Sequence, residues 1–290
     1  MTYLSQCPQG LREAFTTGGL APIKSTPEEV YAATYKKVIE RNQAYYAKFP
    51  EDVNTIHELA YHIKSKGGLK LPSGGILTVR LFLTLGRDFG FHGGLDSVHD
   101  LVYRMKSDLA QFQFITRPTL SELEAALTFE NAVLYAVLHE AIYCQRGASN
   151  WAADRVGKSL TEFRWLVGSP DSPASIREHP LFFSGEMIYP FLFEVFPELE
   201  KLAPAAKIIA EVSDWPALYD EWQLAKNEVP LYSLTYIDDM YVDYHLAQQT
   251  AKLVKNCKQA VTNGMYHNAL RSKSADAFKA LFALRDDSLD

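Results

Sequence analysis

The clearest pattern in the chain is a run of apolar, β-branched and aromatic residues that ends abruptly in acidic residues. The run spans Val229–Ile237, and Asp238, Asp239 and Asp243 follow it. A short apolar run of this kind predicts a buried strand. Open α/β sheets place their chemistry at the C-terminal ends of such strands, so the three carboxylates are candidate catalytic acids. The pattern by itself leaves the choice among them open.

A second stretch of the same design follows further along the chain. Ala260–Thr262 is typical of a short strand, which runs into a turn at Gly264 and then into His267. An acid after one strand and a histidine after the next form the late half of an α/β-hydrolase triad, whose chain order is nucleophile, acid, histidine. The two stretches therefore predict an α/β fold in which this histidine is a candidate base and the nucleophile lies earlier.

Between residues 25 and 227 the hydrophobic pattern changes to a helical one. Thr26–Glu29 combines an N-cap, a proline at the first helical position and a glutamate at the third, which predicts a helix start. A stripe with helical spacing follows at Val30, Tyr31, Thr34, Tyr35, Val38, Ile39, Tyr45 and Tyr46. Further helical segments are expected from about residue 51 to the glycines at 67 and 68, and at 77–87, 94–112, 120–145 and 160–167.

These patterns predict three parts. Residues 1–24 form part of a hydrolase core, with the tail of a helix at Thr2–Pro8 and a strand at Leu11–Thr16. Residues 25–227 form an inserted helical cap domain, because this stretch is too long for a single crossover helix between strands. Residues 228–290 return to the core with the last two strands and a C-terminal helix.

Composition and charge narrow the function classes. The chain has 290 residues, 47% of them hydrophobic, with a net charge of −6 and no cluster of basic residues. These values indicate a globular protein and argue against nucleic acid or an anionic membrane as a partner. Cys7, Cys144 and Cys257 fit neither a disulfide framework nor a zinc site. No apolar run approaches the ~20 residues that span a bilayer, and Met1–Gly10 lacks a signal-peptide pattern. We predict a cytoplasmic protein without metal or cofactor.

Two carboxylates in the helical region lie among apolar residues. His139 and Glu140 follow an apolar stretch at Leu127–Leu138, which is expected to be one helix. Glu140 is then either a solvated residue at a capped helix end or a desolvated functional carboxylate. Glu186 lies within the aromatic and aliphatic run Phe182–Glu194. A buried carboxylate without a partner costs several kcal/mol, so Glu186 should face either an arginine of the protein or a cationic ligand.

Motifs spread over nearly the whole chain match one enzyme family. They include Gly10–Glu13, Thr17–Pro22, Val30–Tyr35, Leu71–Gly75, His139–Cys144, Ala148–Ala153, Gly185–Pro190, Asp214–Pro216 and Tyr236–Val242. On these residues the chain resembles the prolyl aminopeptidases (proline iminopeptidases), α/β-hydrolase serine peptidases, and in particular the branch with an extended cap. The resemblance implies release of N-terminal proline from small peptides.

The resemblance also implies site residues. The Asp-Met step after the strand makes Asp239 the triad acid and His267 the triad base. Glu186 matches the cap carboxylate that binds the cationic amine of the substrate, and Glu140 is a second candidate for this role. Phe183 and Tyr189 are candidate ring contacts to the pyrrolidine, as are Phe182 and Phe191.

The sequence departs from the family pattern at the nucleophile. Complete members carry an oxyanion loop and a Gly-x-Ser-x-Gly elbow before the part that resembles Thr2–Gly10, and this sequence contains no Gly-x-Ser-x-Gly. Ser73, Ser149 and Ser184 lie in the expected cap. We therefore expect this chain to be the C-terminal portion of such an enzyme and to be inactive alone. A truncated gene model, a split gene or a pseudoenzyme would each produce a sequence of this kind. The alternatives are a non-catalytic interaction protein derived from the cap and another α/β hydrolase of the esterase or epoxide hydrolase type.

Overall fold

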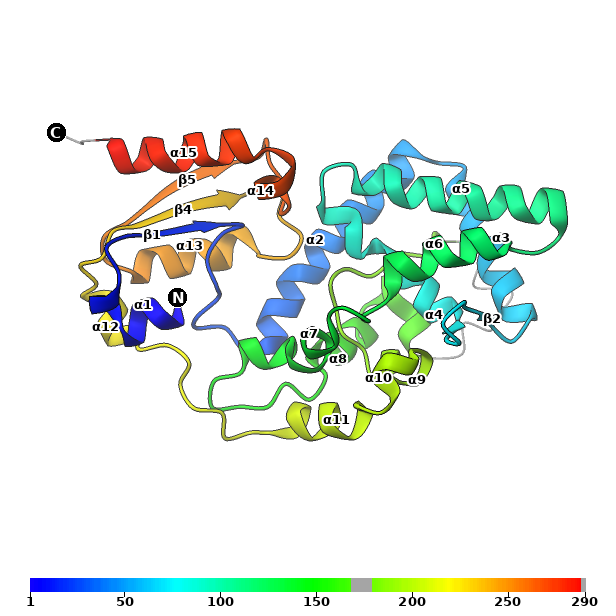
Figure 1. The fold of residues 1–290 in the computed structure, drawn as a ribbon, viewed down its shortest axis with the longest axis horizontal. Helices are drawn as coiled ribbons and strands as arrows, with labels where there is room; N and C mark the ends of the chain where they lie inside the picture. The colour runs from blue at the N-terminus through cyan, green and yellow to red at the C-terminus, as the bar shows by residue number, and fades with distance from the viewer. Residues whose placement is uncertain (168–178, 288–290) are drawn as a thin grey trace.

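A small parallel sheet and a larger helical region make up the chain. The computed structural model describes residues 1–167 and 179–287. Figure 1 shows the sheet with its helices at one end of the molecule, the helical region at the other, and the long helix α2 (Pro27–Lys48) between them. The predicted α/β class is confirmed.

The sheet has three strands in the order β1 (Ala14–Thr17), β4 (Leu231–Tyr236) and β5 (Cys257–Thr262). Both neighbouring pairs are parallel. All six residues of the central strand β4 are buried, as its apolar run predicts. Helix α15 (Ser274–Asp286) covers one face, and α13 (Tyr244–Leu253) covers the other (Figure 1). Helices on both faces are the usual way in which a parallel sheet is buried.

The N-terminal elements lie beside the sheet on the same side as α13 (Figure 1). Helix α1 (Thr2–Gln6) leads into the 3₁₀ turn η1 (Pro8–Gly10), and α1 contacts α12 (Glu221–Ala225). The structure therefore has a short helix where the sequence predicted helical residues. Leu4 and Leu224 are both buried in the apolar cluster under this side of the sheet.

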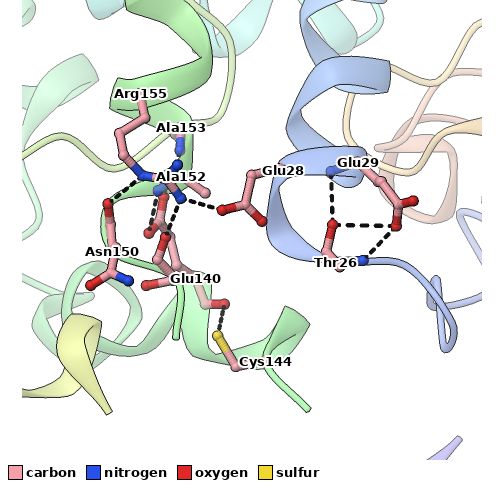
Figure 2. Close-up of polar contacts among 10 residues, drawn as sticks. Thr26, Glu28, Glu29, Glu140, Cys144, Asn150, Ala152, Ala153 and Arg155 are labelled. Atoms are coloured by element: carbon pink, nitrogen blue, oxygen red, sulfur yellow. Dashed lines mark hydrogen bonds and ion pairs between the residues drawn. The ribbon is translucent and has the colours of Figure 1, made fainter. Parts of the chain in front are cut away.

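Helix α2 begins with the predicted capping box. The Glu29 amide donates to Thr26 Oγ1 at 3.3 Å, and the Thr26 amide donates to Glu29 Oε2 at 2.8 Å (Figure 2). These two bonds satisfy amides that the first helical turn leaves without partners. The inward stripe of α2, including Tyr31, Tyr35 and Tyr45, is buried in the large core of the helical region.

The remaining elements of the helical region are mostly short. They are α3 (Asp52–Ser65), β2 (Leu69–Lys70), β3 (Ile76–Leu77), α4 (Val79–Phe82), η2 (Leu83–Gly90), α5 (Gly94–Phe112), α6 (Arg117–Leu127), α7 (Val133–Leu138), η3 (Glu140–Tyr143), α8 (Ala152–Lys158), η4 (Thr161–Leu166), α9 (Leu192–Val195), α10 (Pro197–Glu200) and α11 (Ala203–Glu211). Helix α14 (Ala269–Ser272) follows the last strand. Within residues 1–167 and 179–287, no helix combines the length and the hydropathy that a membrane crossing needs.

The prediction of one continuous helix over residues 120–145 is wrong. Helix α6 ends at Leu127, and the next helix begins only at Val133. Thr128 has an extended backbone, and Glu198 of α10 accepts hydrogen bonds from the Thr128 hydroxyl (2.6 Å) and the Phe129 amide (3.1 Å). A glutamate distant in sequence thus satisfies donors at the break. The antiparallel pair β2–β3 was likewise not expected in the helical region.

Candidate active site

Asp239 lies in the turn that follows β4 and is 2% exposed. Its Oδ1 accepts hydrogen bonds from the amides of Tyr241 (2.8 Å) and Val242 (3.0 Å). A carboxylate that bonds amides two and three residues further along the chain stabilises its own turn. One oxygen is therefore anchored to the backbone, and Oδ2 is directed toward His267.

His267 follows β5 and faces this carboxylate. Its Nδ1 lies 2.9 Å from Asp239 Oδ2, and its ring lies 4.6 Å from the ring of Tyr241. The side chain is 35% exposed, so the ring is not sealed inside the protein. When Nδ1 donates to the carboxylate, the neutral imidazole carries its free lone pair on Nε2, which is the arrangement a general base needs.

The charges around His267 tune its pKa. Burial acts to lower the pKa of this imidazole, but the hydrogen bond and the negative charge of Asp239 outweigh burial, and the charge of Glu186 adds to them. The net result is a pKa raised above the ordinary histidine value. Both carboxylates therefore favour the protonated form that a base adopts after it accepts a proton.

The other two acids after β4 have different partners. Asp238 is half-exposed and lies 3.6 Å from Lys37 Nζ. Asp243 caps α13, because its Oδ1 accepts a hydrogen bond from the Leu246 amide at 2.9 Å. Of the three acids that the sequence left open, the structure brings Asp239 to the histidine.

A glycine that the sequence reasoning did not single out also approaches the imidazole. Gly18, in the turn after β1, has a φ of +73°, and a Cβ added there would lie 3.0 Å from His267 Cε1. Any larger residue would be strained and would press on the ring. The only signal in the sequence was the glycine pair after the first strand.

Glu186 is partly exposed and lies among tyrosines. The Tyr135 side chain hydrogen-bonds to it. Burial is the main cause of the raised pKa of Tyr135, Tyr143 and Tyr241, and the Glu186 charge adds to it in each case. Burial lowers the pKa of the nearby His139 in spite of this charge. Phenols and an imidazole that burial keeps uncharged therefore lie near the carboxylate, and the positive charge of Arg87 acts on two of these phenols, those of Tyr135 and Tyr241.

No ion pair within the described residues involves Glu186. Of the two partners expected from the sequence, an arginine within ion-pair distance is thus not found in this part of the chain, although the Arg87 charge acts on the same Tyr135 and Tyr241 side chains. The carboxylate is also close enough to His267 to raise the pKa of that imidazole. A cation held by Glu186 would therefore lie near the candidate base.

Glu140 caps a helix. Its carboxylate is 6% exposed and accepts hydrogen bonds from the amides of Ala152 (3.1 Å) and Ala153 (2.9 Å) at the start of α8 (Figure 2). The interpretation of Glu140 as a solvated residue is wrong, because the start of α8 folds over it. Burial raises the pKa of Glu140, and the amide hydrogen bonds oppose the shift. Its second predicted role, in substrate binding, stays a prediction.

Phe183 and Tyr189 lie inside the core, each with 0% exposure. The Phe183 ring contacts those of Tyr45 and Phe89 at centroid distances of 5.7 and 5.4 Å. The Tyr189 hydroxyl lies 2.9 Å from that of Tyr35. Rings without exposed surface cannot contact a substrate in this conformation, so the geometry gives the predicted ring contacts no support.

The hydroxyls of the three serines in the expected cap hydrogen-bond to groups other than the candidate base His267. The Ser73 hydroxyl donates to Glu124, Ser149 hydrogen-bonds to Glu140, and Ser184 is fully buried. In the part of the chain that the structure describes, no hydrogen bond joins any of these hydroxyls to a histidine. None of them therefore forms a triad with His267.

One group of side chains has the spacing of metal ligands. Ligand atoms of Glu51, Asp52 and His99 lie within 4.8 Å of one another, the one such group found among residues 1–167 and 179–287. The Asp52 carboxylate already accepts hydrogen bonds from the Tyr45 hydroxyl and His99 Nδ1. The group is accounted for as a hydrogen-bonded network at the start of α3.

Comparison with known proteins gives two similar sequences, both full-length matches to this chain. A proline iminopeptidase of Aspergillus aculeatus, aneH, is 39% identical over 291 residues, covering 100% of this chain and 62% of the relative. A proline iminopeptidase of Aeromonas sobria is 36% identical over 287 residues, covering 99% of this chain and 64% of the relative. The chain thus spans a little under two thirds of the length of these relatives. No protein-family model matches it.

Proposed function

Because the chain is related along its whole length to the proline iminopeptidases, we propose that it supplies the acid, the base and the amine-binding carboxylate of a serine aminopeptidase that releases N-terminal proline from peptides. The relatives imply the α/β-hydrolase fold, in agreement with the parallel sheet. The observation that carries the proposal is the pair Asp239–His267, with Glu186 near enough to influence the imidazole.

The pair supports general acid–base chemistry. In the proposed reaction, His267 Nε2 accepts the proton of a serine hydroxyl as that oxygen attacks the carbonyl carbon of proline. The imidazolium then donates the proton to the leaving amine, and Asp239 holds the ring orientation and stabilises its positive charge. The same cycle repeats with water as the nucleophile to release free proline.

The nucleophile is assigned to a segment outside these 290 residues. The sequence contains no Gly-x-Ser-x-Gly, and the relatives are longer than this chain. The acid and base alone cannot form an acyl-enzyme, so the chain by itself is proposed to be inactive. We also propose a cytoplasmic location, on the basis of three free cysteines that are widely spaced.

Recognition of proline is proposed to rest on Glu186. An N-terminal proline carries a cationic secondary amine, which a partly desolvated carboxylate binds more strongly than water does. Of the tyrosine rings near Glu186, that of Tyr135 is 36% exposed and is proposed to contact the same cation. His139, which burial keeps neutral, adds no repulsion to the amine.

The test is hydrolysis of a proline anilide by the protein produced from its complete gene. We expect release of the aniline, and we expect it to be faster for proline anilide than for a matched N-acetylproline anilide, which lacks the cationic amine. Treatment with a serine-directed inhibitor should abolish this activity. Hydrolysis of simple esters without proline release would instead favour another α/β hydrolase. No hydrolysis of either substrate by the folded protein would favour a non-catalytic interaction protein.

A further inference from the structure

The loop that carries His267 is attached to the helical region through one residue, His92. The Tyr266 amide donates a hydrogen bond to His92 Nε2 at 3.1 Å, and the His92 amide donates to Asn268 Oδ1 at 3.0 Å. The His92 and Tyr266 rings also meet edge to face, 4.9 Å apart. One residue between η2 and α5 therefore holds both chain neighbours of the candidate base.

We propose that His92 is a positioning residue that holds the His267 imidazole in register with Asp239, an inference that rests on the function proposed above. One of its hydrogen bonds holds the Tyr266 amide and the other holds the Asn268 side chain, so the loop is attached on both sides of His267. Loss of either bond frees the backbone next to the imidazole. His92 itself does not touch the reacting atoms.

The segment before His92 also contacts the turn that carries the acid. A Cβ added to Gly90 would lie 2.8 Å from Met240 Cβ and 2.3 Å from a ring carbon of Tyr241, so this backbone lies directly against the turn. The Tyr241 hydroxyl donates to the Arg87 carbonyl, and the Phe91 ring stacks on the Tyr241 ring at 5.2 Å. One short segment therefore contacts the acid turn and the base loop together.

Two cations support this arrangement. Arg41 of α2 donates from Nε to the Phe89 carbonyl at 2.9 Å, and its guanidinium carbon lies 4.9 Å from the centre of the Tyr266 ring. Lys273 donates from Nζ to the Gly264 carbonyl at 2.8 Å. The base loop is thus held from α2, from the η2–α5 junction and from its own C-terminal side.

The hydrogen bond from Tyr266 determines which nitrogen of the His92 ring carries the proton. Nε2 accepts the Tyr266 amide proton, so it carries no proton of its own, and the ring proton resides on Nδ1. Burial and the positive charge of Lys273 lower the pKa of His92, which favours this neutral form. The geometry needs a side chain with an acceptor at this position, and glutamine offers one.

The experiment is an NMR titration of the His267 imidazole in the protein produced from its complete gene. In the wild type we expect a pKa above the ordinary value, as the neighbouring carboxylates dictate. His92→Ala should lower this pKa by about one unit, because the imidazole moves away from its carboxylate partner. It should also lower kcat on proline anilide by roughly 10- to 100-fold with little change in KM.

Two comparisons separate positioning from general damage. His92→Gln keeps an acceptor for the Tyr266 amide and should restore most of the His267 titration. His62→Gln replaces a histidine on α3, whose pKa burial also lowers, and should change nothing at His267.

A folded His92→Ala protein with an unchanged His267 titration would overturn the inference. If that variant does not fold, Asn268→Ala removes the acceptor for the His92 amide alone, and an unchanged titration there would also overturn it. The titration needs no substrate, so a wild type that hydrolyses no proline anilide would refute the proposed function without deciding the role of His92.

Discussion

Two carboxylates with different surroundings lie near the His267 imidazole. Asp239 is buried, anchored by two amides and directed at the imidazole. Glu186 is partly exposed, hydrogen-bonded to a tyrosine and without an ion pair in the described residues. The first is therefore suited to orient a base, and the second is suited to bind a cation from solution.

Glu186→Gln tests the second assignment. Because it removes one partner of a partly desolvated charge pair, we expect kcat/KM for proline anilide to fall by an amount equivalent to ~2–4 kcal/mol. Glu194→Gln, at an exposed position in the same run of aromatic residues, is the control and should leave the kinetics unchanged. Equal kinetics of the Glu186 variant and the wild type would remove Glu186 from the site.

The pH dependence of kcat/KM in the wild type and in Glu186→Gln provides a second test of Glu186. His267 must be neutral to accept a proton, so kcat/KM should rise with pH through the pKa of this imidazole. The two carboxylates place that pKa above its ordinary value, and loss of the Glu186 charge should move the rising limb to lower pH. A limb that moves to higher pH in Glu186→Gln would contradict this electrostatic account.

At the scale of elements, the sequence could predict what local pattern determines. The strand β4, the capped start of α2 and the histidine after β5 each follow from neighbouring residues. The break after Leu127 could not be predicted, because it depends on Glu198, which lies far along the chain. The role of His92 was hidden for the same reason, since its hydrogen-bond partners at 266 and 268 are distant in sequence.

The aromatic residues show the same limit. The family resemblance made Phe183 and Tyr189 candidate contacts to the pyrrolidine ring, whereas packing places both inside the core. Tyr135 and Tyr143, which do lie near Glu186, had no distinguishing signal in the sequence. Periodicity indicates which residues share a helix face, but it does not show which face of which helix borders a site.

Glu140 provides a test at the scale of one helix. Glu140→Ala leaves the amides of Ala152 and Ala153 without their acceptor, and each buried unsatisfied donor costs about 1–3 kcal/mol. We expect the free energy of unfolding, measured with urea, to fall by about 2–6 kcal/mol. Glu58→Ala, at an exposed position on α3, should have little effect. A loss of proline anilide hydrolysis without a loss of stability would instead show that Glu140 acts on the substrate.

At the scale of the molecule, the sheet has an edge that the described residues leave open. Strand β1 pairs only with β4. Phe15 of β1 is 37% exposed and, with Phe282 of α15, forms an apolar surface beside this edge. Open edges next to exposed apolar groups favour pairing with another chain. The 290-residue chain produced alone should therefore self-associate, which analytical ultracentrifugation can measure.

A charged residue on this surface tests whether the surface causes the self-association. Phe15→Lys should shift the chain toward the monomer, whereas Phe112→Lys, at another exposed phenylalanine on α5, should not. A chain that is monomeric at high concentration without any substitution would show that the edge is protected.

The central claim is that Asp239 and His267 act together as acid and base in proline release. Its most direct test compares the kcat for proline anilide of two neighbouring variants, Asp239→Asn and Asp238→Asn, in the protein produced from its complete gene. Asp239→Asn should lower kcat by about 10⁴-fold with the fold intact, because the imidazole loses the acceptor that sets its tautomer. Asp238→Asn, whose carboxylate faces Lys37, should retain nearly full activity. Loss of activity in Asp238→Asn with little change in Asp239→Asn would contradict the account.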